Sequence, residues 1–247
     1  MKDTKENTKK NIFSVQQIAE ILDALEGMYP EAECELDFAD KFQLIIAVVL
    51  SAQTTDKSVN KVTPALFEKY PDAFAMARAG EIAAEERGLD ADKLDDEQLQ
   101  ALAIEDISEI IKRIGMYKTK SKNIFNLARC LAEQYAGEVP EDYEKLVALP
   151  GVGRKTANVV LSVGFGHQRI AVDTHVFRVA NRIGLANEKD VLKTELALMD
   201  TLPEERWSRS HHSLIFHGRY CCDARKPKCD ECNIRTYCKY CSELKKV

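Results

Sequence analysis

The chain has 247 residues, of which 45% are hydrophobic and 30% charged, with a formal net charge of −5. This length can bury a sizeable core, and the composition is typical of soluble globular proteins. No stretch approaches the roughly 18 apolar residues of a membrane span, and the polar N-terminal segment lacks the apolar region of a secretory signal. We therefore expect an intracellular, cytoplasmic protein in a reducing environment, with no membrane partner.

Helical periodicity dominates the chain, and no segment has a convincing strand pattern. Pro64 is expected near the first turn of its helix, Asp173 is a natural N-cap, and Gly184 suits the position after a last turn. The sequence therefore predicts an all-α fold. We predict helices over residues 15–28, 37–50, 59–70, 104–114, 124–135, 143–149, 156–163, 174–183, 191–202 and 207–216.

Charge is spread unevenly along the chain. Residues 80–109 hold eleven acidic and two basic side chains, a net charge of −9, which leaves +4 for the rest of the chain. This acidic segment is weakly apolar, and Gly80 and Gly88 are expected to break it into short helices or an exposed excursion. A basic remainder fits a protein that meets a polyanion with one face, although an uneven surface without any partner has the same composition.

The stretch Leu149–Ala157, LPGVGRKTA, predicts two helices joined by a tight turn, because Pro and Gly cannot continue a helix. The backbone N–H groups at the start of the second helix are free to bind an anion, phosphate above all. Lys155 lies in the first turn of that helix. A simple turn with a solvated lysine explains the same residues, because a Gly-rich helix start is by itself a weak signal of function.

Two loop segments are candidates for a functional role because of their side chains. The polar break Ser51–Asp56 follows a buried helix, which would aim the side chains of the break. Met116 lies at an expected loop tip, which is unusual for an apolar residue. Either Met116 packs back on its own helix, or the exposed apolar tip has a function.

Six of the eight cysteines lie near the C-terminus, whereas Cys34 and Cys130 lie apart and are expected to be buried small apolar residues. In a reducing compartment a dense cysteine group indicates a metal or cluster before a disulfide. Spacing alone leaves both zinc and an iron–sulfur cluster open. The group consists of Cys221, Cys222, Cys229, Cys232, Cys238 and Cys241.

Taken together, these motifs resemble the endonuclease III family of DNA glycosylases and abasic-site lyases, in the helix-hairpin-helix-Gly-Pro-Asp superfamily. The resemblance covers about residues 14–240 and rests on four segments and the cysteine spacing. The segments are LSAQTTD at 50–56, LPGVGRKTA at 149–157, VDTHVFRV at 172–179 and HGRY at 217–220.

The resemblance implies two α-helical domains with DNA bound in the cleft between them. A six-helix barrel domain would span residues 34–167 and contain the helix-hairpin-helix, with an acidic insertion near 78–103 that is longer than the family leads us to expect. Residues 13–33 and 168–247 would form a discontinuous iron–sulfur cluster domain. Residues 1–12 are expected to be a disordered tail.

The resemblance also implies roles for individual residues. Lys155 matches the catalytic lysine, which displaces the base and forms a Schiff base with the sugar, and Asp173 matches the catalytic carboxylate. A [4Fe–4S] cluster would be held by Cys222, Cys229, Cys232 and Cys238, which lowers the weight of zinc, while Cys221 and Cys241 leave a shifted ligand set open. The expected DNA-binding residues are Gln53, Met116, Gly151, Val152, Gly153, Arg154, His175, Lys226 and Lys228.

The implied activity is excision of oxidised or ring-saturated pyrimidines in base excision repair, with β-elimination 3′ to the abasic site. The expected partner is duplex DNA with damaged bases or abasic sites, bound by a monomer associated with the nucleoid. One rival is the adenine glycosylase branch, which normally lacks the lysine after the hairpin and has a further C-terminal domain. Another is a non-catalytic helix-hairpin-helix module in which Lys155 only contacts phosphate.

Overall fold

The computed structural model describes residues 12–244, and every regular element in this range is helical, as predicted. The chain divides into two compact units, Cys34–His167 and the pair Met1–Glu33 with Gln168–Val247. The predicted tail over residues 1–12 lies, except for Ile12, outside the described residues. Among the described helices, none has the length and apolar character needed to cross a membrane.

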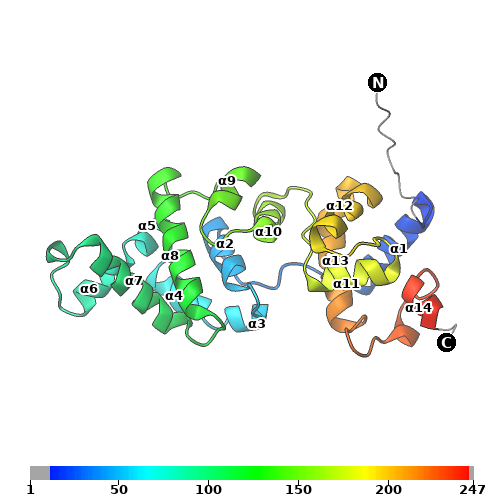
Figure 1. The fold of residues 1–247 in the computed structure, drawn as a ribbon, viewed down its shortest axis with the longest axis horizontal. Coiled ribbons are helices and arrows are strands. Elements are labelled where there is room, and N and C mark those ends of the chain that lie inside the picture. Colours follow the sequence, from blue (N-terminus) through cyan, green and yellow to red (C-terminus); the bar gives the residue numbers. More distant parts are fainter. Residues whose placement is uncertain (1–11, 245–247) are drawn as a thin grey trace, which may run out of the picture. The chain divides into compact units, whose positions relative to one another are not determined.

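The unit over Cys34–His167 is built around one buried helix, α2, which packs against α8 and α10. Every residue of α2 from Phe42 to Leu50 is buried except Gln43. In chain order the unit contains α2 (Lys41–Leu50), α3 (Asp56–Val59), α4 (Thr63–Lys69), α5 (Ala73–Ala77), α6 (Ala79–Glu86), the 3₁₀ turn η1 (Ala91–Lys93), α7 (Asp96–Ile111), α8 (Tyr117–Gln134), α9 (Tyr143–Ala148) and α10 (Arg154–Phe165) (Figure 1).

Several helix boundaries in this unit differ from the prediction, and the helix expected over 124–135 begins already at Tyr117. The helix expected over 37–50 begins only at Lys41, because the side chain of Asp40 accepts a hydrogen bond from the backbone N–H of Gln43 and caps it. The helix expected over 59–70 is the shorter α4, which starts only at Thr63, while Val59 is the last residue of the preceding α3. Pro64 has no N–H to donate and therefore suits the first turn of a helix, where it lies.

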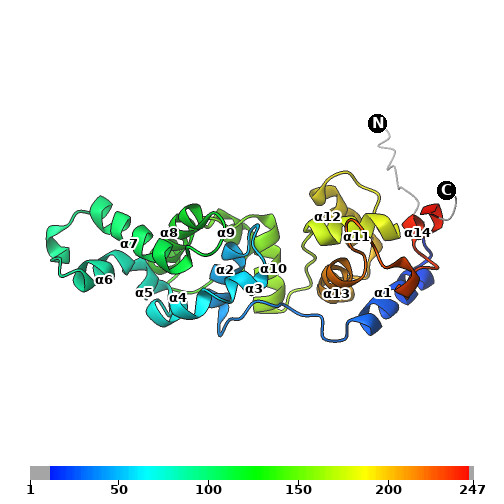
Figure 2. The ribbon, with the colours of Figure 1, turned by 90° about the horizontal axis from the view of Figure 1, so that it is seen from below.

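The acidic segment folds as a pair of packed helices, α6 and α7, which lie side by side in both ribbon views (Figures 1 and 2). Gly80 does not break this segment but lies inside α6, where a Cβ atom would sit 2.2 Å from the carbonyl oxygen of Leu99. The helix predicted over 104–114 begins instead at Asp96, because Asp95 and Gln98 form a reciprocal capping box. At position 80, glycine is therefore needed for the close packing of α6 on α7.

The second unit packs α1, α11 and α13 around a core of aliphatic side chains. Its helix boundaries follow the prediction closely: Ser14 caps α1, and α11 runs from the N-cap Asp173 to Gly184, as expected. Its last helix was not predicted. The unit contains α1 (Val15–Met28), α11 (Thr174–Ile183), α12 (Val191–Thr201), the 3₁₀ turns η2 (Glu204–Arg206) and η3 (Cys229–Glu231), α13 (Trp207–Tyr220) and α14 (Lys239–Leu244).

Candidate active site

The turn between α9 and α10 forms a candidate anion site. Gly151 has φ of +77°, and a Cβ atom there would lie 2.9 Å from the Cβ of Asn123 in α8, so both backbone and packing require glycine. Val152 is buried and anchors the turn. Gly153 is the N-cap of α10 and supplies no side chain to cap the helix. No side chain caps the first turn of α10, and a helix start of this kind suits an anion such as phosphate.

Lys155 is the second residue of α10, and its side chain is exposed. Its neighbour Arg154 is also exposed, and its guanidinium donates a hydrogen bond of 3.2 Å to the hydroxyl of Tyr143. The turn thus combines an amine, a cation and uncapped backbone donors within a few residues. This arrangement can hold a phosphate and present a nucleophile next to it.

Gln53 and Met116 share an uncommon backbone conformation. Both lie in the left-handed region, with φ of 53° and 56°, although neither is glycine. Gln53 is exposed in the turn after α2, and Met116, 51% exposed, is the N-cap residue of α8. About half of the Met116 surface is therefore open to solvent. Two exposed side chains on strained turns are suited to reach into a ligand.

Lys120 connects these two turns and was missed in the sequence. Its side chain is buried, and its ammonium donates a hydrogen bond of 2.6 Å to the hydroxyl of Thr54, next to Gln53. Its backbone N–H donates to the carbonyl of Met116. Loss of solvent on burial lowers the pKa of Lys120. The sequence held one indication, because Lys120 falls on the same helical stripe as the buried Ile124 and Leu127.

Asp173 caps α11, and one carboxylate oxygen makes all the capping contacts. Its Oδ1 accepts hydrogen bonds of 2.8 Å from the backbone N–H groups of His175 and Val176. Within residues 12–244, the other oxygen of Asp173, Oδ2, accepts no hydrogen bond. His175 is half-buried, and its Nδ1 lies 3.2 Å from the guanidinium of Arg178. One oxygen of Asp173 thus serves the fold while the other can face a substrate.

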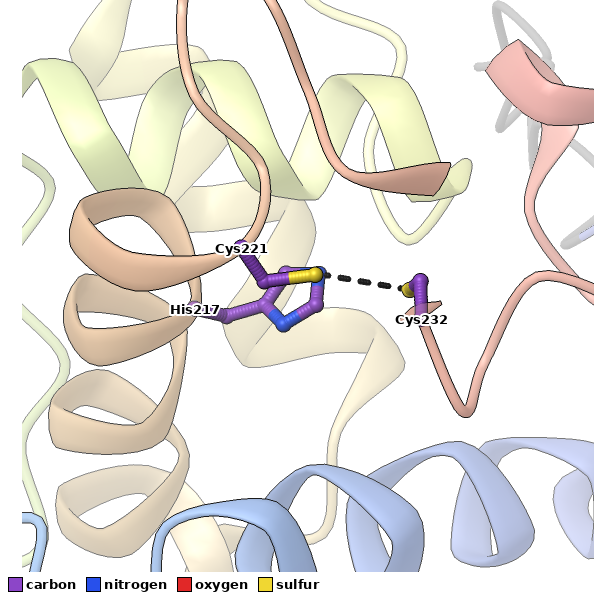
Figure 3. A group of neighbouring side chains, drawn as sticks. All are labelled: His217, Cys221 and Cys232. Carbon is purple, nitrogen blue, oxygen red and sulfur yellow. Dashed lines mark hydrogen bonds between the residues drawn. The ribbon is translucent and has the colours of Figure 1, made fainter. Parts of the chain in front are cut away.

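All six C-terminal cysteines line one pocket beside α13. The ligand atoms of His217, Cys221 and Cys232 lie within 4.8 Å of one another (Figure 3). His217 is buried, which lowers its pKa to about 4, so its imidazole is neutral at pH 7. Its Nδ1 lies 3.3 Å from the Tyr29 hydroxyl and its Nε2 lies 3.7 Å from the Cys232 sulfur.

Two arginines of α11 hold the loop that begins this pocket, and sequence reasoning gave neither a specific role. Arg182 donates to the carbonyls of Asp223 and Ala224 at 2.6 and 2.8 Å, and to the sulfur of Cys222 at 3.4 Å. Arg178 donates to the carbonyl of Cys222 at 3.2 Å. The only indication in the sequence was a basic region, which does not reveal that these side chains bind carbonyl groups.

Comparison with known proteins identifies the family. The model for "HhH-GPD superfamily base excision DNA repair protein" matches residues 46–204. Endonuclease III of Bacillus subtilis (strain 168) is 46% identical over 229 residues, 92% of this chain and 94% of the relative. Endonuclease III of Escherichia coli (strain K12) is 47% identical over 221 residues, 90% of this chain and 94% of the relative. The chain belongs to the endonuclease III family.

A solved structure supports the same assignment at the level of the fold. A trapped endonuclease III–DNA covalent intermediate aligns with a TM-score of 0.80 at 42% identity, over 95% of this chain and 100% of that one. The predicted activity of a DNA N-glycosylase and abasic-site lyase is therefore confirmed. It follows that the chain is neither a member of the adenine glycosylase branch nor a non-catalytic hairpin module.

The cofactor is assigned by a second family model, the "Iron-sulfur binding domain of endonuclease III", which matches residues 222–238. The match starts at Cys222 and ends at Cys238, and it decides against zinc. The pocket fits the group, because thiolates hold iron–sulfur clusters and all four expected ligands line it. Burial raises the pKa of Cys232 to about 12 and of Cys238 to about 11. A bound metal is therefore needed to keep these thiols ionised.

The expected DNA-binding residues are divided between the two units. Gln53, Met116 and the residues 151–154 belong to the unit Cys34–His167, together with Lys155. Asp173, His175, Lys226 and Lys228 belong to the other unit. Lys226 and Lys228 are exposed in the loop whose carbonyls Arg182 binds, and the backbone N–H of Lys228 donates to the carbonyl of Cys221. Their loop is thus fixed while their ammonium groups stay in solvent.

Proposed function

We propose that this glycosylase uses Lys155 as its nucleophile to remove oxidised or ring-saturated pyrimidines from duplex DNA. One observation carries the proposal: an exposed amine in the first turn of α10, directly after a glycine turn with uncapped N–H groups. A phosphate held by those groups belongs to the strand that carries the damaged sugar. With the phosphate held in this way, Lys155 would lie close to the sugar without reading the base.

The chemistry follows from an amine at that place. The deprotonated amine of Lys155 attacks the anomeric carbon, the base leaves with the bonding electron pair and takes up a proton, and the sugar ring opens to a Schiff base. The imine acidifies the adjacent sugar carbon. Removal of a proton from that carbon expels the 3′ phosphate, which cleaves the strand by β-elimination. Water then releases Lys155 from the product.

We assign to Asp173 the stabilisation of the positive charge that develops on the sugar as the base leaves. Its Oδ1 accepts both capping hydrogen bonds of α11, so the carboxylate is held in one orientation. Oδ2 is then available to stabilise positive charge on the sugar or to accept the proton of the attacking amine. The trapped covalent intermediate of the endonuclease III relative supports a covalent route of this kind.

Access to the base requires the nucleotide to leave the stack, at a cost of a few kcal/mol. We propose that Gln53 and Met116 fill the space that it leaves, because both are exposed on fixed left-handed turns that Lys120 ties together. The phosphates would be held by Gly151, Val152, Gly153, Arg154, His175, Lys226 and Lys228. The cluster would be held by Cys222, Cys229, Cys232 and Cys238, and it would give rigid support to the loop that contains Lys226 and Lys228.

We also propose that the protein acts as a monomer inside the cell, at the nucleoid. The free thiols of its cysteines fit a reducing compartment. Light scattering of the cluster-loaded protein, alone and with a lesion duplex, tests the monomer. A mass of two chains under either condition contradicts it.

Borohydride trapping tests the catalytic assignment. Wild-type protein should give a covalent product with abasic DNA, and Lys155→Gln should give none while retaining its affinity for DNA. Asp173→Asn keeps an oxygen that can cap α11 but removes the charge, so it should fold normally and lose roughly 100-fold in rate. Failure of the wild type to be trapped contradicts the Schiff base. A panel of lesion duplexes then determines which bases are removed.

A further inference from the structure

The cluster pocket contains two more thiols than a four-cysteine site needs. Cys221 and Cys241 are both buried, with 6% and 7% of their surface exposed, and both line the same pocket as the four proposed ligands. Neither belongs to the segment from Cys222 to Cys238 that matches the iron–sulfur family model. Their thiols therefore lie beside the cluster without being assigned to it.

Each additional thiol contacts a different proposed ligand. Cys221 is hydrogen-bonded to Cys232, which faces it across the pocket (Figure 3). Cys241 is hydrogen-bonded to Cys229. The contacts are therefore with the two cysteines of the central C-x-x-C pair, and each additional thiol has one partner within that pair.

Both additional thiols are held by their own elements, independently of the proposed ligands. Cys221 follows the last turn of α13, where its backbone N–H donates to the carbonyl of His217 and its carbonyl accepts from the N–H of Lys228. Cys241 is a buried residue of α14. Loss of the Cys229 or Cys232 side chain would leave these positions in place.

From this geometry we infer that Cys221 and Cys241 are reserve ligands of the cluster, Cys221 for the iron bound by Cys232 and Cys241 for the iron bound by Cys229. Two thiols in contact can reach the same iron atom, and a thiol that binds it releases its proton to solvent as the iron–sulfur bond forms. The cluster then survives the loss of one ligand of the central pair. The inference rests on the proposed ligand set Cys222, Cys229, Cys232 and Cys238.

The two outer ligands have no such partner. No thiol–thiol hydrogen bond joins Cys222 or Cys238 to a cysteine in the described range; Arg182 donates to the sulfur of Cys222, and Cys238 donates to a backbone carbonyl. An arginine and a carbonyl oxygen cannot replace a thiolate. The inference therefore divides the four proposed ligands into two that can be replaced and two that cannot.

Single alanine substitutions at the four ligands test this division in full-length protein produced with its cluster. The measurements are iron and acid-labile sulfide per chain, with the visible absorbance of the cluster and far-ultraviolet circular dichroism as a control for folding. Cys229→Ala and Cys232→Ala should retain more than half of the wild-type iron and sulfide. Cys222→Ala and Cys238→Ala should lose most of both. Equal loss in all four variants overturns the inference.

Second substitutions identify the replacement ligand. Cys221→Ala and Cys241→Ala alone should keep the full cluster, because neither is a primary ligand. Cys232→Ala combined with Cys221→Ala should lose it, whereas Cys232→Ala combined with Cys241→Ala should behave as Cys232→Ala does. A cluster that persists without Cys221 and Cys232 contradicts the inference and points to His217. Retention in Cys222→Ala or Cys238→Ala would instead contradict the proposed ligand set.

Discussion

At the scale of single residues, Lys120 shows how a buried charge can serve a surface site. Its ammonium is removed from solvent and bonds to Thr54, and no ion pair joins it to a carboxylate in residues 12–244. Burial of a charge without a counter-charge costs free energy. Here Lys120 fixes the turns of Gln53 and Met116 relative to each other.

Substitution of Lys120 by Met should therefore stabilise the fold at neutral pH, by roughly 1 kcal/mol, since it removes the charge and keeps the volume. The native pKa of Lys120 is lowered, so the folded protein loses this proton at a lower pH than the unfolded chain does. Wild-type stability thus rises relative to Lys120→Met as pH climbs through the lowered pKa toward about 10.4. Urea unfolding of both proteins at several pH values measures the difference.

Thr54→Val provides the matched control, because it leaves the buried ammonium without its hydroxyl partner. It should lower the free energy of unfolding by about 1–2 kcal/mol at pH 7, the opposite sign to Lys120→Met. A difference between Lys120→Met and wild type that stays constant with pH would show that the buried ammonium does not titrate at a lower pH in the folded state.

Gly151→Ala should destabilise the hairpin by about 2–3 kcal/mol, because alanine is strained at φ +77° and its Cβ would press on the Cβ of Asn123. Gly153→Ala is the control. Its φ is −99° and no heavy atom lies within 4 Å of the added Cβ, so it should cost at most about 1 kcal/mol as a poorer N-cap. Thermal unfolding compares the two. Equal shifts in Tm would rule out a special requirement at Gly151.

At the scale of elements, Gly80 explains why the acidic segment forms two packed helices. A Cβ atom there would overlap the backbone of Leu99, so α6 and α7 pack with their backbones in contact. Gly80→Ala should separate these helices and cost more than about 2 kcal/mol locally. Gly27→Ala should stabilise α1 by about 0.5–1 kcal/mol, because its Cβ would point into open space. For Gly80→Ala, amide hydrogen exchange should show a loss of protection that is confined to α6 and α7.

The outcome for each element shows what local patterns can and cannot predict. The bounds of α11 follow from its N-cap Asp173 and from Gly184, because both act within a few residues of the helix end. The structure of α6 depends on Leu99, which is distant in sequence, so Gly80 was mistaken for a helix breaker. The same holds for the site. Lys155 lies in a local motif, whereas the contacts of Lys120 and Arg182 link residues that are 66 and about 40 positions apart.

At the scale of the whole molecule, charge is separated along the chain. The net charge of −9 over residues 80–109 falls largely on α6 and α7, whereas the exposed Lys226 and Lys228 lie in the loop beside the cluster pocket. Arg182 donates hydrogen bonds to two carbonyls of that loop, and both lysines of the loop are exposed. A protein with negative net charge can thus bind DNA through a local basic surface.

The salt dependence of DNA binding measures this surface directly. Each phosphate neutralised by a cation releases counterions, so the logarithm of the binding constant falls with that of salt concentration by about 0.9 per contact. Lys226→Ala and Lys228→Ala should each reduce that slope by about one, and the double variant by about two. Fluorescence anisotropy with an abasic-site analogue, over a range of salt concentrations, gives the slopes, and unchanged iron content shows that the cluster is intact.

Lys93→Ala is the matched control, because this exposed lysine lies in the acidic segment and pairs with Asp90, so its slope should equal that of wild type. A loss of affinity in the loop variants with no change in slope would mean that these lysines support the fold of the loop and do not contact phosphate.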